Sequence, residues 1–314
     1  MEEIKSENGV PGLQKGDSGS VGLGSREACL YGLKWGIVTN MAVNASHMRV
    51  FITGGSSGIG AALGKEFALR GAKVILAARD VCRLETVRDA IREQGGWAEL
   101  VMCDVTNDHS VAKGLAFAED KLGGLDVVVA NAGFGVVGLV EQLSLADFVR
   151  QFETNVFGVV RTIKVSIPLL RASRGIAVIM GSVSGYLAVP GSAPYSMSKF
   201  AVRAFAESLR GELTPYGVSV VLLSPGFVES NIRRVDNHGI LHEEAPDTAP
   251  PSLVMPAEKA ARKMVRAILR RQPELVLTGH GKLAVYLARF FPNLCRRLAR
   301  RARARGQPPG PGSG

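Results

Sequence analysis

Short apolar, β-branched runs alternate with longer segments of helical periodicity from Met48 onward. Residues 74–78 and 127–130 are apolar throughout, which is typical of strands buried on both faces of a parallel sheet. The predicted strands cover residues 49–53, 73–78, 98–103, 126–130, 175–181, 218–223 and 274–278. The predicted helices between them cover residues 58–71, 80–95, 107–122, 144–172, 192–215 and 257–271. This alternation predicts an α/β fold in which a single domain holds one doubly wound parallel sheet.

The two ends of the chain differ from this regular middle. Residues 1–47 are rich in Gly, Ser and polar residues without a sustained period, so we expect a disordered or extension segment, with Met41 or Met48 as candidate native starts. Residues 48–280 carry the alternating pattern and form the predicted catalytic domain. Residues 281–314 begin apolar and end basic, which predicts a C-terminal helix followed by a flexible tail.

Composition and charge narrow the class of protein. With 46% hydrophobic and 21% charged residues, the chain has the composition of a soluble globular protein. Its four scattered cysteines form no CxxC pair, which indicates a reducing compartment, predicts a cytoplasmic location and argues against a bound metal. No apolar run reaches 18 residues, and the first residues do not resemble a signal peptide.

The net charge of +10 is concentrated near the C-terminus. Seven arginines and no acid lie in residues 289–305, and removing them leaves a net charge of +3, which argues against a nucleic-acid-binding body. The apolar stretch 283–291 adjoins these arginines, and two interpretations stay open. One is peripheral membrane contact through an interfacial segment. The other is a helix packed on the substrate side, followed by a solvated basic tail.

The most informative pair of residues is Tyr195 and Lys199, which lie four positions apart and therefore on one face of a helix. A phenol titrates near pH ~10 in water, and an ammonium group one turn away favours its anion. Such a tyrosine passes a proton to or from an alcohol or ketone oxygen while another agent moves a hydride. Taken alone, the same spacing also occurs on ordinary helix surfaces.

A glycine-rich segment, Thr-Gly-Gly-Ser-Ser-Gly-Ile-Gly at residues 53–60, joins the first predicted strand to the first helix. Its glycines permit a tight turn and a close backbone approach, so that the helix N-terminus faces a pyrophosphate. The segment predicts a dinucleotide site whose contacts include Gly54, Ser56, Ser57, Gly58, Ile59 and Gly60.

The end of the second predicted strand bears on the choice of cofactor. An NAD site usually carries an acidic residue there, whereas this chain has Arg79, and the following Asp80 also resembles a helix cap. The guanidinium favours a 2′-phosphate, so NADP(H) is the preferred cofactor. If Arg79 is only a solvated surface charge, NAD(H) stays open.

Further candidate ligand-binding residues follow the other strands, at the edge where open α/β sheets bind ligands. These residues are Asp104 and Val105, Asn131 with Ala132 and Gly133, Ser182, and Pro225 with Gly226. Ser182 precedes Tyr195 by thirteen residues, and a hydroxyl there holds a substrate oxygen beside the phenol. The alternative is a loop serine that bonds to its own backbone. His238 and His242 lack the glutamate of HExxH and are interpreted as surface histidines of a proline-rich loop, without metal.

In order and spacing, these motifs resemble the short-chain dehydrogenase/reductase family over about residues 49–230. The resemblance implies a Rossmann-like fold and a tetrad of Asn155, Ser182, Tyr195 and Lys199. Tyr195 would be the general acid/base and Ser182 would polarise the carbonyl. Lys199 would lower the tyrosine pKa and bind the nicotinamide ribose, while Asn155 would hold a water in the proton relay.

The same resemblance implies the remaining contacts to the cofactor. Asp104 and Val105 would contact the adenine and Asn131 would stabilise the central strand; the other cofactor residues would be Ala132, Gly133, Pro225, Gly226 and Val228. The chain departs from the family pattern at Ala130, where a second Asn is usual, and at Ser230, where a Thr is frequent. Family members are commonly dimers or tetramers, so a homo-oligomer is implied, and the 227–256 region would cover the substrate.

These expectations combine into an NADP(H)-dependent oxidoreductase that interconverts a secondary alcohol and a ketone. The basic C-terminus and the glycine motif are similar to those of 3-ketodihydrosphingosine reductases and other lipid- or steroid-acting members. A lipophilic substrate of 3-keto-sphingoid, steroid or acyl type is expected, because the terminal segment is apolar and few charges are predicted near the site. The alternatives are an NAD-dependent alcohol dehydrogenase and a catalytically silent dinucleotide-binding scaffold, against which the complete tetrad argues.

Overall fold

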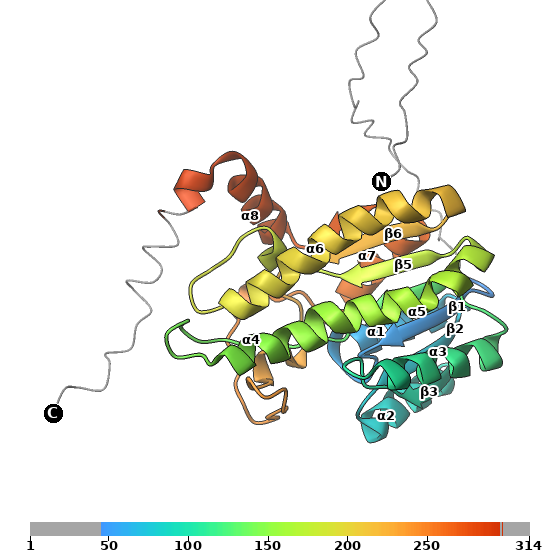
Figure 1. Cartoon of the computed structure of the whole chain (residues 1–314). Coiled ribbons are helices and arrows are strands. Elements are labelled where there is room, and N and C mark those ends of the chain that lie inside the picture. Colours follow the sequence, from blue (N-terminus) through green and yellow to red (C-terminus); the bar gives the residue numbers. More distant parts are fainter. Residues whose placement is uncertain (1–44, 296, 298–314) are drawn as a thin grey trace, which may run out of the picture. The chain divides into compact units, whose positions relative to one another are not determined.

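The computed structural model describes residues 45–295 and 297, which fold around one seven-stranded parallel sheet (Figure 1). The strands are β1 (Arg49–Thr53), β2 (Lys73–Ala78), β3 (Trp97–Met102), β4 (Val127–Ala130), β5 (Ile176–Met180), β6 (Ser219–Ser224) and β7 (Glu274–Val276). The helices are α1 (Gly58–Leu69), α2 (Val81–Glu93), α3 (Asp108–Leu122), α4 (Leu145–Phe152), α5 (Gly158–Ser173), α6 (Ala193–Leu213), α7 (Ala257–Leu269) and α8 (Gly279–Phe290). The predicted doubly wound α/β fold is confirmed.

The strand order β3-β2-β1-β4-β5-β6-β7 shows where the winding direction of the sheet reverses. The chain builds outward from β1 to β3, then returns to lay β4 on the other side of β1. Ile52 of β1 therefore pairs with Leu76 on one side and with Val129 on the other. Ligands of open α/β sheets bind where the winding direction reverses, beyond the carboxyl ends of β1 and β4.

Helices cover both faces of the sheet because each strand is apolar on both sides. In β1, Val50 and Ile52 face the layer that contains α1, α2 and α7, whereas Phe51 faces the layer of α3, α5 and α6. All three side chains are completely buried. Figure 1 shows α5 and α6 in front of the sheet, with α1 and α7 behind it.

The single helix predicted over residues 144–172 is wrong in one respect. Helix α4 ends at Phe152, a π-helical turn follows over Glu153–Phe157, and α5 then continues to Ser173. The turn buries Asn155 completely. Such a turn leaves the apolar periodicity of the flanking segments readable as one helix, and π turns inside helices often coincide with functional sites.

The strand predicted over 274–278 is also shorter than expected and ends at Val276. Thr278 instead caps α8, accepting a hydrogen bond from the Gly281 N–H at 3.2 Å, so that the C-terminal helix begins before residue 281. Within residues 45–295 and 297, no helix is both long and apolar enough to span a bilayer. Expectations for residues 1–44, and for the arginines at 296 and beyond 297, lie outside the described residues.

Candidate active site

The glycine-rich loop between β1 and α1 brings backbone against backbone. A Cβ atom on Gly60 would lie 2.1 Å from the Gly54 carbonyl oxygen, and one on Gly54 would lie 2.8 Å from the Ala132 Cα. Gly54 also has a φ of +67°, in the region that favours glycine. Ser56 and Ser57 complete the loop and Ile59 lies in the first turn of α1.

This loop has the features of a phosphate cradle. Within the described chain, no side chain caps the N-terminus of α1, so its first amide groups point outward as hydrogen-bond donors. The partial positive charge of a helix N-terminus favours an anion there. The residues present therefore fit the pyrophosphate of a dinucleotide.

Asn131 ties the ends of β1 and β4 together. Its side-chain amide donates to the carbonyl oxygens of Thr53 and Gly54, at 2.9 and 3.2 Å. In return, the Thr53 hydroxyl accepts from the backbone N–H groups of Asn131 and Ala132, at 3.0 and 3.2 Å. These bonds fix the glycine-rich loop against the central strand.

The residues expected at the adenosine end gather beyond β2 and β3. Arg79 is exposed directly after β2, and Asp80 caps α2 by accepting from the Arg83 N–H at 3.0 Å. The Asp104 carboxylate accepts from the amide and the hydroxyl of Thr106, at 2.9 and 2.8 Å. Val105 is buried. The acid after Arg79 is therefore engaged in capping, which leaves Arg79 as the group at this strand end.

The π-helical turn places Asn155 beside Phe134, on the segment that follows β4. Its side-chain oxygen accepts from the Phe134 N–H at 3.1 Å, and its amide donates to the Phe134 carbonyl at 2.9 Å. The amide also reaches the Ser198 hydroxyl at 3.2 Å, and that hydroxyl donates to the Tyr195 carbonyl at 2.7 Å. Asn155 is thus connected through Ser198 to the helix that carries Tyr195.

Tyr195 and Lys199 lie one turn apart near the start of α6. The Lys199 ammonium nitrogen is 5.7 Å from the centroid of the Tyr195 ring. It donates to the Met180 carbonyl, the last residue of β5, at 2.9 Å. Ser182 follows β5, is buried, and accepts from the Ser184 N–H at 3.1 Å. The carboxyl end of β5 therefore brings the serine and the lysine toward the same tyrosine.

Burial dominates the electrostatics of this group. It raises the pKa of the Tyr195 phenol, while the Ser182 hydroxyl and the Arg233 guanidinium act in the opposite direction. Burial also lowers the pKa of Lys199 to about 8. The phenol is therefore protonated at neutral pH, and the lowering of its pKa by Lys199 stays a prediction.

The segment after β6 packs against the segment that carries Ser182. The Pro225 carbonyl accepts from the Val183 N–H at 3.0 Å, next to Ser182. A Cβ atom on Gly226 would lie 2.3 Å from the Thr278 hydroxyl, so only glycine fits there. Val228 is buried, and Ser230 packs against Gly58 of the glycine-rich loop. All of the predicted site residues thus lie along one edge of the sheet.

A family profile described as short chain dehydrogenase matches residues 48–240. The chain belongs to the short-chain dehydrogenase/reductase family. It is 33% identical over 255 residues to 11-beta-hydroxysteroid dehydrogenase A of Sesamum indicum, covering 78% of this chain and 72% of the relative. It is 28% identical to Dehydrogenase/reductase SDR family member 7B of Xenopus laevis, covering 82% and 84% of the two chains.

Solved structures agree with this assignment. An alcohol dehydrogenase from Thermococcus sibiricus, complexed with 5-hydroxy-NADP, is 29% identical with a TM-score of 0.64, covering 74% of this chain and 96% of its own. A short-chain dehydrogenase/reductase from Burkholderia phymatum, in complex with NAD, is 25% identical with a TM-score of 0.69, covering 86% and 99%. The protein is therefore a short-chain oxidoreductase that acts on CH–OH groups with NAD(P).

Sequence reasoning missed an ion pair beside the tyrosine of this dehydrogenase. Arg233 binds Asp247 through two hydrogen bonds, one of them 2.6 Å long, and also donates to the Val228 carbonyl at 3.2 Å. The pair holds the pKa of Asp247 well below its usual range, at about 2. Both residues lie in the aperiodic 227–256 loop, where no local pattern predicts which charges meet.

The 227–256 loop is also fastened to both flanks of the cofactor edge. Asn237 exchanges two hydrogen bonds of 2.9 Å with the backbone of Val137, after β4. Glu243 forms an ion pair with Arg83 of α2, whose first turn follows Arg79. His242 pairs with Asp236 at 2.8 Å within the loop itself. The loop therefore bridges the two sides of the crevice.

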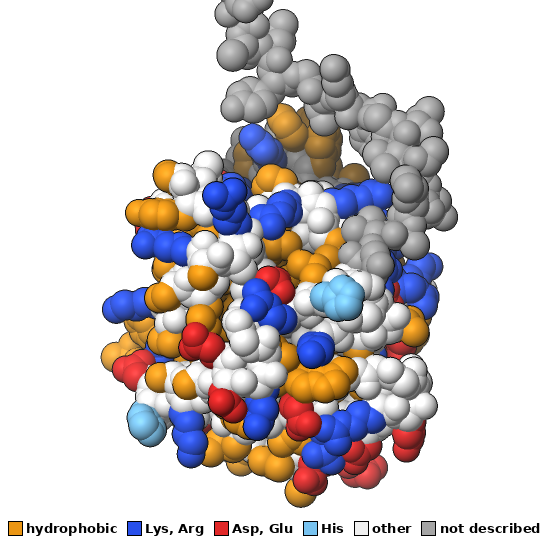
Figure 2. Space-filling view, turned by 90° about the vertical axis from the view of Figure 1, so that its right-hand side faces the viewer, with side chains coloured by type: hydrophobic (Ala, Val, Ile, Leu, Met, Phe, Trp, Pro, Cys, Tyr) orange, Lys and Arg blue, Asp and Glu red, His pale blue; other side chains and the backbone are white. Residues whose placement is uncertain are grey.

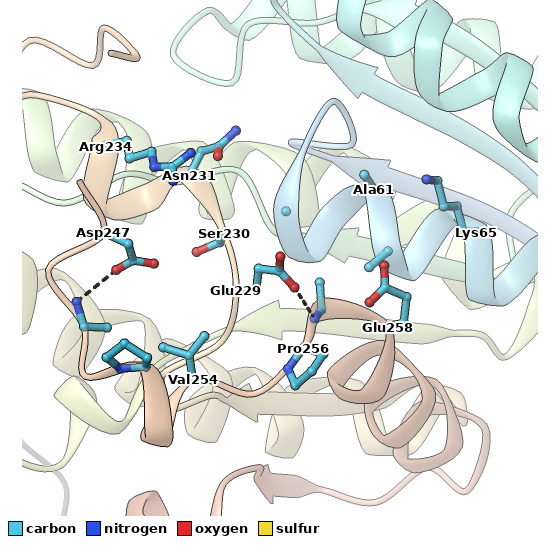
Figure 3. Close-up of a pocket in the computed structure, with 15 residues that line it drawn as sticks. Ala61, Lys65, Glu229, Ser230, Asn231, Arg234, Asp247, Val254, Pro256 and Glu258 are labelled. Atoms are coloured by element: carbon cyan, nitrogen blue, oxygen red, sulfur yellow. Dashed lines mark hydrogen bonds between the residues drawn. The ribbon is translucent and has the colours of Figure 1, made fainter. Parts of the chain in front are cut away.

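A pocket of about 610 Å³ lies between α1 and this loop (Figure 3). In Figure 3, Ala61 and Lys65 approach it from α1, while Asn231, Arg234 and Asp247 approach from the loop. None of Asn155, Ser182, Tyr195 and Lys199 lines it. Because Gly58 and Ser230 do, the pocket adjoins the glycine-rich cradle and the phosphate end of the site.

Proposed function

We propose that this dehydrogenase is an NADP(H)-dependent enzyme that interconverts a secondary alcohol and a ketone on a lipophilic substrate. The observation that carries the proposal is the meeting of Ser182, Tyr195 and Lys199 at the end of β5. The hydrogen bond of 2.9 Å from Lys199 to Met180 fixes the lysine beside the tyrosine. This group stands next to the glycine-rich cradle, so that a substrate carbonyl can lie between phenol and nicotinamide.

Each member of the tetrad has a distinct task in the proposed reaction. When bound, the nicotinamide cofactor supplies or accepts the hydride. Tyr195, whose raised pKa keeps it protonated, donates a proton to the carbonyl oxygen during reduction. Ser182 donates a hydrogen bond to the same oxygen and stabilises the charge that develops there. Lys199 supplies a positive charge and binds the ribose. Asn155 holds a water in the relay that returns a proton to Tyr195.

The preference for NADP(H) is supported by the second strand end. Arg79 is exposed there, and no acidic side chain is free to bind ribose hydroxyls because Asp80 caps α2. A guanidinium suits a 2′-phosphate. The Thermococcus relative is complexed with an NADP derivative and the Burkholderia relative with NAD, so both cofactors occur among similar structures. An NAD-dependent alcohol dehydrogenase is the second candidate.

The lipophilic substrate class is supported by apolar side chains around the site. Val137 and Val140, on the segment after β4, are exposed, as is Phe227 after Gly226. The Sesamum relative is named as acting on a steroid. A steroid, a 3-keto-sphingoid or another acyl ketone fits such surroundings. We also propose a cytoplasmic homo-oligomer that touches membranes at their surface.

Fluorescence titration with NADPH and NADH tests the cofactor. We expect the wild type to bind NADPH more tightly, and Arg79→Ala to lose about 10-fold or more in NADPH affinity, as for a hydrogen bond to a charged group. NADH affinity stays unchanged. Arg88→Ala, which removes an arginine of the following helix α2 that is paired with Asp89, is the control. Tighter NADH binding by the wild type refutes the NADP(H) preference; binding without turnover of any ketone favours the silent scaffold.

A further inference from the structure

The C-terminal helix α8 carries an apolar face that the described chain leaves uncovered. Leu283, Tyr286 and Phe290 follow one side of the helix at helical spacing, with 59%, 54% and 58% of their surfaces exposed. Phe291 and Leu294 continue the same face beyond the helix and are also exposed. Among the residues of α8, only Gly281 is buried. The helix is therefore attached by its first turn and shows its aromatic side outward.

The chain that carries this face is basic from residue 275 onward, and Glu274, just before it, is a half-buried partner of Arg289. From residue 275 to residue 314 the chain has eight Lys or Arg and no Asp or Glu. Lys282 and Arg289, the two basic residues of α8 itself, are both exposed. By contrast, the side of the domain in Figure 2 shows basic and acidic side chains intermixed. An apolar stripe on a helix with exposed basic side chains matches a surface that is apolar within and anionic outside.

The base of α8 touches the reaction centre. A Cβ atom on Gly281 would lie 2.8 Å from the side chain of Val183, the residue after Ser182. The next contact is His280, whose ring accepts from the Phe227 N–H at 3.3 Å and lies 5.6 Å from the Phe227 ring. Phe227 follows the Pro225-Gly226 turn. A substrate that moves along α8 toward its first turn therefore arrives beside Ser182.

We propose that α8 docks its apolar face on an anionic lipid bilayer, so that a lipophilic ketone passes from the bilayer along the helix into the site. Leu283, Tyr286 and Phe290 enter the acyl boundary, while Lys282 and Arg289 meet the lipid headgroups. A second copy of the chain is a poor occupant because two all-basic segments repel each other. The delivery step rests on the proposed lipophilic substrate.

Vesicle flotation with the full chain tests the docking. We expect the wild type to float with phosphatidylglycerol–phosphatidylcholine vesicles and to bind phosphatidylcholine vesicles at least about 10-fold more weakly, since polybasic segments add to apolar insertion. The variant Leu283→Ser/Tyr286→Ser/Phe290→Ser loses at least about 10-fold in vesicle binding. The matched control is Leu69→Ser/Leu145→Ser, whose side chains are 71% and 80% exposed on other helices and which binds as the wild type does.

Two further measurements separate the contributions of charge, apolar insertion and catalysis. Lys282→Glu/Arg289→Glu lowers binding to anionic vesicles while leaving binding to neutral ones unchanged. All variants turn over a water-soluble ketone at the wild-type rate. On a ketone embedded in anionic vesicles, the triple variant and the charge variant both slow, whereas in neutral vesicles only the triple variant slows. A wild type that binds vesicles but does not turn over the water-soluble ketone counts against the proposed reaction and leaves the docking proposal intact.

Three outcomes overturn the docking proposal. The first is a wild type that floats with neither vesicle. The second is a triple variant that floats as well as the wild type, which assigns any binding to the arginines alone. The third is a wild type that is a larger oligomer than the triple variant in light scattering, which assigns the apolar face to a second copy. Circular dichroism of each variant establishes that the exposed substitutions leave the fold unchanged.

Discussion

The cofactor edge and the substrate side of this dehydrogenase are built in different ways. Around β1, β4 and the glycine-rich loop, backbone meets backbone, and Asn131 and Thr53 tie the strand ends with four hydrogen bonds. On the substrate side, the 227–256 loop is held by ion pairs between side chains distant in sequence, such as Arg83 and Glu243. The first construction leaves little freedom to vary, whereas the second allows the substrate side to change without disturbing the sheet.

The sharpest test of this contrast is at the point where the two regions meet. Tyr195→Phe removes the proton donor but keeps the ring that packs beside Gly135. We expect turnover to fall about 10²–10⁴-fold, the range for a general acid, while NADPH binding stays normal. Steady-state kinetics and fluorescence titration measure the two quantities. A rate near that of the wild type would remove Tyr195 from its assigned role.

The rigidity of the cofactor edge is tested at Gly60. A methyl group there meets the Gly54 carbonyl, so Gly60→Ala should cost about 1–3 kcal/mol through overpacking, mostly as lost dinucleotide affinity. Gly211→Ala in α6 is the matched control, because nothing lies within 4 Å of its added methyl group. Titration and thermal unfolding compare the two variants. Equal affinities for NADPH would show that the loop adjusts more easily than its contacts indicate.

The pH dependence of ketone reduction tests the electrostatics of the tetrad. Lysine is charged below its pKa, and burial lowers the pKa of Lys199 to about 8, so its charge is lost above that pH. Tyr195 stays protonated over the same range because its pKa is raised. We expect kcat/KM at limiting NADPH to fall about 10-fold per pH unit above that pKa if the charge is required. A rate that stays flat to pH 10 contradicts this requirement.

The smallest effect is expected at the ion pair that fastens the loop. Glu243 forms an ion pair with Arg83, next to the proposed 2′-phosphate position at Arg79. The two side chains are 73% and 33% exposed. Exposed pairs contribute about 0.2–1 kcal/mol, so Glu243→Gln should tighten NADPH binding by no more than about 5-fold. NADH binding should not change. Glu244→Gln, at the neighbouring position, is the control, and a gain for both cofactors would point to the loop rather than to the phosphate.

The same contrast explains what the sequence could predict. The sheet, its helices and the ends of β1, β2, β4 and β5 follow from local periodicity and from glycine positions, so the fold and the grouping of Ser182, Tyr195 and Lys199 could be predicted. The Arg233–Asp247 pair could not, because both residues lie in a loop without period. Gln151 was also missed: it is completely buried, accepts from Val136 at 2.6 Å and donates to Phe134 at 2.8 Å, as a polar residue in an apolar helix face.

The π-helical turn at Glu153–Phe157 has a consequence for how this chain tolerates change in length. Each residue of an α-helix turns the chain by about 100°, and a π turn accommodates one residue more than an α turn. Deleting one residue there would give a continuous, regular helix and remove a local irregularity. Yet Arg150, which now donates to the Asn237 carbonyl at 2.9 Å, would be turned away from the loop relative to α5. A deletion that makes the helix regular would therefore break its contact with the loop over the crevice.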